Sequence, residues 1–226
     1  MIPVPGPAPL RAVVIVDYQN IHMTARDAFP HFRHLPPHES LVDPLVFARR
    51  LIDKRNARQG EGYRHATLSR VHVYRGLPSN RHDPEAYAWN LANKAEWERT
   101  NIVTVHHRPL RYDVERDARG APIRDIHGRE IVHGKREKGI DVLCALALVR
   151  EVAKPDVDLV IMASHDSDLA PALDEAIDAR SAKVETFRWQ SPDVFVHELR
   201  PTKPRVAWCT RLDATDFAAC VDRRTY

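Results

Sequence analysis

The most informative stretch of the chain is DLVIMASHDSD, Asp158 to Asp168. Its apolar run, Leu159 to Ala163, has the length and composition of a buried strand. It ends abruptly in a polar turn that carries Asp166 and Asp168. Both aspartates are good N-cap candidates for a helix that begins at Leu169. Taken alone, the turn predicts a helix cap, and a metal site is the alternative that the rest of the chain has to support.

Short apolar runs alternate with helical patterns along the chain. The apolar runs predict six strands, at residues 12–16, 71–74, 102–105, 159–163, 183–187 and 205–209. Helical spacing, with Asp-Pro start signals at Asp43 and Asp83, predicts helices near residues 20–29, 44–52, 84–100, 142–152 and 169–180. This alternation is typical of a three-layer α/β domain around a mostly parallel central sheet.

The composition is that of an ordinary soluble protein. Of 226 residues, 43% are hydrophobic and 29% charged, and the longest apolar runs are strand-length, so no membrane-spanning helix is expected. Residues 1–10 are a Pro-rich lead-in without the pattern of a signal peptide. We expect one domain over residues 11–200 and a C-terminal extension, residues 201–226, packed on it. The cysteines have no metal-like spacing, which favours a reducing cytoplasm.

Carboxylates from separate segments are expected to meet at one edge of the sheet. Asp17 ends the first predicted strand, Asp166 and Asp168 follow the fourth, and Asp141 opens a very apolar helix. Sites in open α/β sheets form beyond the carboxyl ends of the strands. Clustered carboxylates repel one another unless a cation neutralises them, and oxygen ligands favour Mg²⁺ or Mn²⁺. A first helical turn would bring Asn20 to the same edge.

Three motifs occur in a characteristic order: DYQN at residues 17–20, EKGIDV at residues 137–142 and ASHDSDL at residues 163–169. The ordered set resembles the NYN-domain family, a branch of the PIN-like nuclease superfamily. The resemblance implies a Rossmann-like PIN fold and a divalent-metal nuclease that usually acts on RNA. The positions that match the family's acidic pocket are Asp17, Asn20, Asp141, Asp166 and Asp168, with Ser164 as a flanking serine.

Two positions depart from the family pattern. His165 replaces a usual glycine, and a β-carbon there costs energy if the turn needs a positive φ. Ala147 stands where many members carry a second aspartate, six residues after Asp141. The loss of that carboxylate would weaken metal binding or leave a pocket that binds without turnover.

A basic segment, residues 108–138, adjoins the KGID motif and is expected to form a flexible hairpin or lid. Arg111 and Lys138 are candidates to contact the RNA backbone, and Tyr112 to stack on a base. The alternative is a solvated hairpin whose own acids offset its charge. Trp89 and Trp97, eight residues apart on one predicted helix, are interpreted as packing residues. A zinc site at His31, His34 and His38 is disfavoured relative to surface histidines.

The leading hypothesis is a Mg²⁺- or Mn²⁺-dependent endoribonuclease that hydrolyses single-stranded RNA. Asp17, Asp141, Asp166 and Asp168 would bind the metal directly or through water, and Ser164, Arg111 and Lys138 would contact substrate. RNA is the expected partner, with a homodimer possible and no membrane association. The main alternative is an RNA- or partner-binding regulatory module of the same fold that has lost turnover, motivated by Ala147 and His165. A small-molecule phosphatase is a third possibility.

Overall fold

The computed structural model describes residues 8–202 and 204–224, so most of the Pro-rich lead-in lies outside the described residues. Within them, a six-stranded sheet has the order β3–β2–β1–β6–β7–β8, and every pairing in it is parallel. Its strands are β1 (Leu10–Asp17), β2 (Ala66–Leu77), β3 (Val103–Pro109), β6 (Leu159–Ala163), β7 (Lys183–Trp189) and β8 (Trp208–Leu212). The predicted fold class is confirmed.

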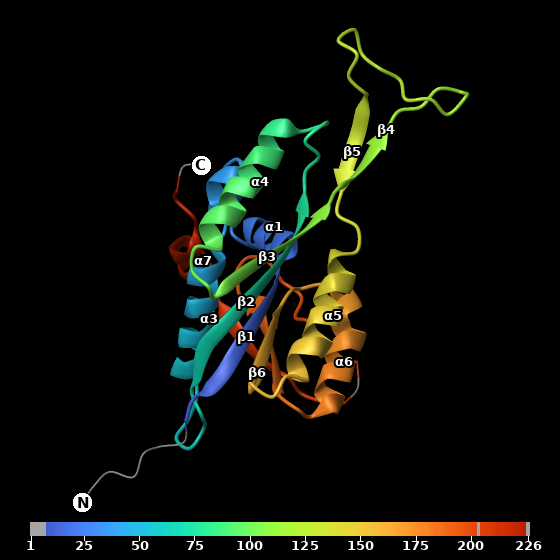
Figure 1. Ribbon diagram of the computed structural model, residues 1–226. Coiled ribbons are helices and arrows are strands. Elements are labelled where there is room, and N and C mark those ends of the chain that lie inside the picture. Colours follow the sequence, from blue (N-terminus) through green and yellow to red (C-terminus); the bar gives the residue numbers. More distant parts are fainter. Residues whose placement is uncertain (1–7, 203, 225–226) are drawn as a thin grey trace, which may run out of the picture.

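Helices cover both faces of this sheet (Figure 1). The longer ones are α1 (Tyr18–Ala28), α3 (Pro44–Ala57), α4 (Pro84–Trp97), α5 (Ile140–Val152), α6 (Ala170–Ala179) and α7 (Ala214–Cys220). Short turns of helix are α2 (Pro30–Arg33), η1 (Pro37–Ser40) and η2 (Ser167–Leu169). They interrupt what the sequence presents as connecting loops.

Strand β1 lies in the middle of the sheet and contributes to two hydrophobic cores. Val14 and Val16 belong to the cluster that includes residues of α1, α3 and α7, whereas Val13 and Ile15 belong to the cluster with α5 and α6. Successive side chains of a strand point to opposite faces, and both faces here are buried. This explains the uninterrupted apolar run before Asp17, which is typical of a central parallel strand.

Strand β6 runs parallel to β1, with Ala163 opposite Val16. The two strands therefore end side by side, and the chain leaves both at the same edge of the sheet. Asp17 and the turn from Ser164 to Asp168 come directly after these strand ends. The topology thus places two of the three acidic segments next to each other.

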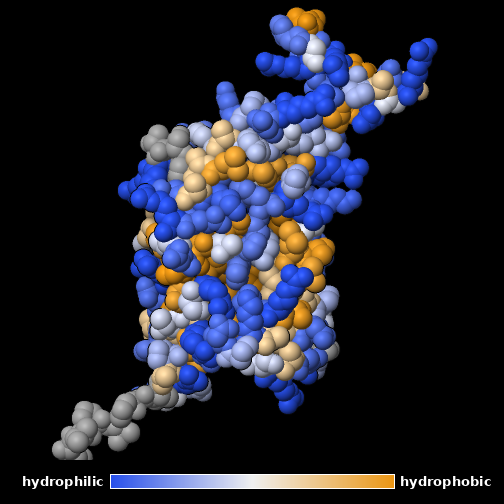
Figure 2. Space-filling view, in the orientation of Figure 1, coloured by the Kyte–Doolittle hydropathy of each residue, from blue (hydrophilic) through white to orange (hydrophobic). Residues whose placement is uncertain are grey.

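A separate antiparallel hairpin, β4 (Arg111–Val114) with β5 (Val132–Arg136), interrupts the α/β pattern. Figure 1 shows it rising beyond the carboxyl ends of the sheet strands. Two further bridges, Arg116 to Pro122 and Arg124 to Glu130, order its distal turns. Figure 2 shows that the projecting hairpin is mostly hydrophilic.

The C-terminal segment completes both the sheet and one core. The sixth strand was predicted at residues 205–209, whereas β8 spans Trp208–Leu212 and so begins three residues later. Arg205 lies before this strand and forms an ion pair with Asp178 of α6. Phe217 and Cys220 of α7 belong to the same core as β1. Beyond α7, Asp222 accepts a hydrogen bond from the Trp97 indole at 2.9 Å. None of the described helices is long and apolar enough to span a bilayer.

Candidate active site

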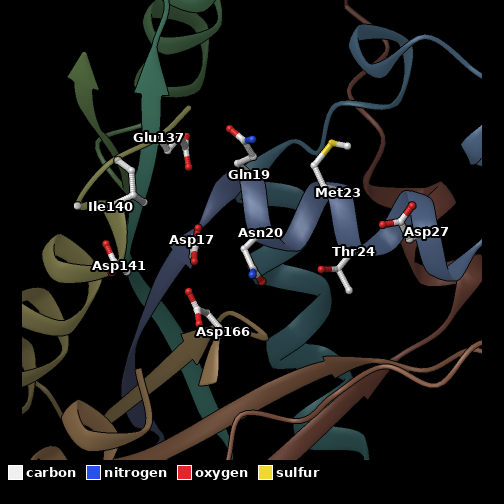
Figure 3. A pocket seen from close by; sticks show the side chains of 11 residues that line it. Asp17, Gln19, Asn20, Met23, Thr24, Asp27, Glu137, Ile140, Asp141 and Asp166 are labelled. Carbon is white, nitrogen blue, oxygen red and sulfur yellow. The ribbon is translucent and has the colours of Figure 1, made fainter. Parts of the chain in front are cut away.

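An acidic pocket of about 490 Å³ opens at the carboxyl ends of β1 and β6 (Figure 3). Its walls come from α1, from the segment that leads into α5, and from the turn after β6. It is lined by Asp17, Gln19, Asn20, Met23, Thr24, Asp27, Glu137, Gly139, Ile140, Asp141 and Asp166. Three of the four predicted metal-binding aspartates therefore line one cavity, together with Asn20.

Asp17 is the most buried carboxylate of the pocket, with 5% of its surface exposed. It occupies the N-cap position of α1 but makes no side-chain capping bond. Burial raises its pKa to about 7, and the nearby charges of Glu137 and Asp166 add to the rise. A hydrogen bond donated by Ser164 acts in the opposite direction. Asp17 is thus a carboxylate held in a site that disfavours its charge.

Ser164 differs from the expectation that it contacts substrate. It is fully buried, and its Oγ donates to Asp17 Oδ2 at 3.0 Å and accepts from the Asp166 backbone N–H at 3.1 Å. The hydroxyl therefore connects the ends of β1 and β6 and fixes the orientation of the Asp17 carboxylate. This is a positioning role.

His165 is accounted for by its neighbours. Its backbone N–H and its Nδ1 both lie within hydrogen-bond distance of Asn20 Oδ1, at 2.8 and 3.2 Å, and the Trp189 N–H donates to its Nε2 at 3.3 Å. These partners require Nδ1 to carry the proton. The ring also packs edge-on against Phe187, with centroids 5.0 Å apart. Burial lowers the His165 pKa to about 3, so the ring is neutral.

The turn at His165 does not need a glycine. Among the described residues other than glycine, a positive φ occurs at Arg180 and not at His165. The side chain costs no backbone strain there and ties the turn to β7 and to Asn20. The energetic objection to His165 is therefore removed.

Asp166 and Asp168 have different environments. Asp166 lines the pocket, and its Oδ1 also accepts from the Asp168 backbone N–H at 2.9 Å, which caps η2. The two predicted roles of Asp166, cap and pocket carboxylate, thus occur together. Asp168 is exposed and is not part of the pocket lining. Its assignment as a metal ligand remains a prediction.

Asp141 lies in the first turn of α5 and lines the pocket. The preceding Gly139 has a φ of 76°, in the left-handed region, and acts as the N-cap of the helix. A glycine is favoured at this position because other residues adopt that conformation at a cost. Ala147, six residues further on, is buried in the core formed with α6. It lies outside the pocket lining.

Glu137 is a pocket carboxylate that the sequence reasoning did not nominate. Its Oε1 accepts a hydrogen bond from the backbone N–H of Gly76, and burial raises its pKa. A β-carbon at position 76 would overlap Leu110 Cδ2 and lie 2.8 Å from Glu137 Oε1, so a larger residue there would displace both side chains. The signal available was its place in the motif EKGIDV, two residues before Gly139.

The donor set of the pocket suits a hard cation. Five carboxylates line it, from Asp17, Asp27, Glu137, Asp141 and Asp166, and its described lining contains no lysine or arginine. Within the described parts of the chain, no three acidic, histidine or cysteine side chains are close enough to enclose an ion together. Mg²⁺ usually keeps several waters and contacts one or two protein carboxylates, and this pocket fits that mode.

The predicted substrate contacts, Arg111 and Lys138, are exposed and do not line the acidic pocket. Tyr112, a candidate for stacking on a base, accepts a hydrogen bond from the Ser79 backbone N–H at 2.9 Å and lies against the ring of His82. It joins the hairpin to the end of β2. The structure therefore gives Tyr112 an internal role.

Comparison with known families now adds to this geometry. The profile described as NYN domain matches residues 11–200. The chain belongs to the NYN family. This family has a PIN-like fold, and its members are generally nucleases that typically use divalent metals.

Comparisons with individual proteins add little to the family assignment. No curated protein matches the chain. A crystal structure of a protein of unknown function from Vibrio parahaemolyticus is similar to it, with 18% identity and a TM-score of 0.41. The match covers 81% of this chain and 84% of that one. At this level it carries no argument about function.

Proposed function

We propose that this NYN protein is a divalent-metal-dependent endoribonuclease that hydrolyses single-stranded RNA. The observation that carries the proposal is the acidic pocket, where five carboxylates gather, no lysine or arginine is among the described lining residues, and Asp17 has a pKa of about 7. A cluster this costly persists in a fold when it performs a function.

The roles of the residues follow from their positions. Asp17, Asp141 and Asp166 would hold Mg²⁺ or Mn²⁺, partly through water, with Glu137 facing the same cavity. Such an ion, when bound, lowers the pKa of water and stabilises charge during phosphodiester cleavage. Ser164 orients Asp17, and Asn20 holds the turn through His165. Asp168 would act through water because its side chain lies outside the cavity.

RNA as substrate is supported by the family and by the basic hairpin. Lys138 lies between the pocket residues Glu137 and Gly139, and Arg111 is paired with Arg136 across the hairpin. Both are exposed, and neither forms an ion pair with a described residue. By contrast, Arg136 is paired with Asp113 at 2.6 Å, and Arg81 with Glu130 at 2.6 Å. The unpaired cations are the ones available to phosphate groups.

The test is cleavage of a labelled single-stranded RNA by the purified protein with Mn²⁺, with and without EDTA. We expect cleavage that EDTA stops, that Asp17→Asn abolishes and that Asp193→Asn leaves unchanged, since Asp193 is exposed and outside the pocket. Equal trace activity in wild type and Asp17→Asn would overturn the proposal. RNA binding without cleavage, unaffected by EDTA, would instead establish the regulatory module. Hydrolysis of a generic phosphoester without RNA cleavage would indicate a phosphatase.

A further inference from the structure

A second cavity, of about 400 Å³, adjoins the acidic pocket. The two share Gln19, Met23 and Glu137 as lining residues, so they are contiguous. The second cavity lies between α1, the end of β2 and α4, and its volume is in the range of small-molecule sites, roughly 300–1,000 Å³. A ligand that enters the acidic pocket can therefore extend into it.

Arg75 lines this second cavity and lacks the partners that a buried guanidinium normally has. It lies near the end of β2, with its charge over the ring of Tyr18 at 4.5 Å and near that of Trp97 at 5.5 Å. Its guanidinium forms no hydrogen bond or ion pair with any described residue, and its Nη1 is buried without a partner. Burial lowers its pKa.

The two most buried arginines of the described chain, Arg55 and Arg26, have hydrogen-bond partners. Arg55 donates to both carboxylate oxygens of Glu185, at 3.0 and 3.1 Å. Arg26 donates to Ser40 Oγ at 2.9 Å and to the Leu35 carbonyl at 2.6 Å. An unpaired buried charge is costly. Arg188 also has a buried Nε without a partner, but Arg75 differs from it because Arg75 lines the second cavity, where a ligand can reach it.

The groups around Arg75 cannot supply its missing anion. The charge of Glu137 acts on Arg75 and raises its pKa, but the Glu137 carboxylate accepts a hydrogen bond from Gly76 and forms no ion pair with Arg75. Two neighbouring histidines, His22 and His107, have pKa values lowered to about 4 by burial, and the charge of Arg75 contributes to both shifts. They are neutral near pH 7. The anion has to come from a ligand.

The remaining walls offer an amide pair and an aromatic surface. Asn90 and Asn93 of α4 are 8% and 2% exposed, and the Oδ1 atom of each is buried without a partner. Trp89 is 41% exposed, contrary to its expected packing role, and lies against the ring of His38 with centroids 4.8 Å apart. Amides read the edges of nucleobases, and aromatic rings stack on their faces.

We propose that the second cavity binds one nucleotide unit, with its phosphate on Arg75, its base edge on Asn90 and Asn93, and its base face against Trp89. As an assignment to the substrate strand it rests on the proposed function, because the unit would be the nucleotide next to the cleaved bond. The site explains why a cation without partners, two unsatisfied amides and an exposed tryptophan occur together beside the acidic pocket.

The experiment is equilibrium binding in EDTA, where cleavage plays no part. The probes are adenosine 5′-monophosphate, adenosine, inorganic phosphate and a hexa-adenylate RNA, and intrinsic tryptophan fluorescence and calorimetry report binding. We expect the monophosphate to bind more tightly than adenosine or phosphate, and the hexamer to bind more tightly still. Equal affinity for monophosphate and hexamer would assign the cavity to a free nucleotide and overturn the substrate-strand assignment.

Variants identify the groups involved. Arg75→Met keeps the apolar stem on Tyr18 and should weaken monophosphate binding about tenfold or more, because it removes a charge-assisted contact. Arg58→Met, at an exposed arginine outside the cavity, is the matched control. Should Arg75→Met fail to fold, Trp89→Ala decides, since Trp89 is half-exposed and its loss should weaken both adenosine and monophosphate binding. Unchanged affinity in a folded Arg75→Met or in Trp89→Ala would overturn the site.

Failure of this site and failure of the nuclease proposal give different results. Binding that depends on Arg75 in a protein that never cleaves RNA would keep the nucleotide site and reject the nuclease. Cleavage that Asp17→Asn abolishes, with Arg75→Met equal to wild type in affinity and KM, would keep the nuclease and reject the site.

Discussion

Charged side chains form ion pairs near one end of the central sheet and lack such partners near the other. Near the amino ends of the strands, charged side chains are paired: Arg11 with Asp158 at 2.8 Å, Arg55 with Glu185 at 3.0 Å, and Arg70 with Asp156 at 2.6 Å. At the carboxyl ends, the five carboxylates of the acidic pocket form no ion pair within the described chain. The same sheet therefore carries charged side chains that are neutralised by a partner at one end and carboxylates without an ion-pair partner at the other.

This difference separates stability from function. A paired buried charge is a structural solution, because each partner satisfies the other. An unpaired cluster lowers the stability of the fold and is retained for what it binds. Arg75 and the acidic pocket both belong to the second kind, and they adjoin. We therefore expect that removing one partner of an ion pair near the amino ends of the strands destabilises the protein. Removing an unpaired carboxylate at the carboxyl ends should stabilise the metal-free protein.

The largest expected effect comes from Glu185→Leu at the amino end. The side chains of Arg55 and Glu185 are 1% and 0% exposed, so this change leaves Arg55 buried without its carboxylate. We expect the free energy of unfolding to fall by about 3–5 kcal/mol, measured by urea denaturation. The double variant Arg55→Met/Glu185→Leu should recover most of the loss. A loss below that of an exposed control such as Asp193→Asn would show that the pair is dispensable.

The opposite sign is expected for Asp17→Asn in EDTA. The pKa of Asp17 is raised from 3.8 to about 7, so the unfolded chain releases this proton first as the pH rises. The stability of metal-free wild type should therefore fall between about pH 4 and pH 7 and remain reduced above. Asparagine removes this dependence, which is worth on the order of 2–4 kcal/mol at pH 8. Urea midpoints of both proteins across this range measure it, and a destabilised variant at pH 8 would contradict it.

The sequence was sufficient to predict which acidic residues lie together at one edge of the sheet. Asp17 and Asp166 could be placed together because parallel strands end at one edge of the sheet, and Asp141 because its helix had to pack there. Asn20 followed from one helical turn. These inferences need only topology, which the alternation of strands and helices carries.

The other features of the site depend on side-chain orientations, which a sequence pattern does not encode. Glu137 lies in an irregular segment, and its orientation depends on the contact with Gly76. Arg75 is one residue of an ordinary strand pattern, and nothing in its neighbours indicates that it lacks a partner. The orientations of Ser164 and Asp168 also depend on the turn, in which the Ser164 hydroxyl donates to Asp17 and Asp168 is exposed.

Metal binding should relieve the repulsion at the carboxyl end. At a Mn²⁺ concentration of about 100 times its Kd, the folded state gains about 2.7 kcal/mol. For a chain of this length this corresponds to a rise in Tm of roughly 5–10 °C. We expect the rise in wild type above pH 7, its reversal by EDTA, and its absence in Asp17→Asn, all measured by thermal unfolding. A similar rise in both proteins would place the metal elsewhere.

The smallest effect is expected where an exposed pair is removed at the amino end. Arg11 lowers the pKa of Asp158 to about 2, so this carboxylate contributes stability above about pH 4 that is lost as the pH falls towards 2. Because Arg11 and Asp158 are 49% and 27% exposed, solvent screens the pair and Asp158→Asn should lower the urea midpoint far less than Glu185→Leu. Added salt should shrink the difference further. An effect as large as that of Glu185→Leu, or a gain in stability, would break the contrast between the two ends, since burial of a paired charge would then not determine what its loss costs.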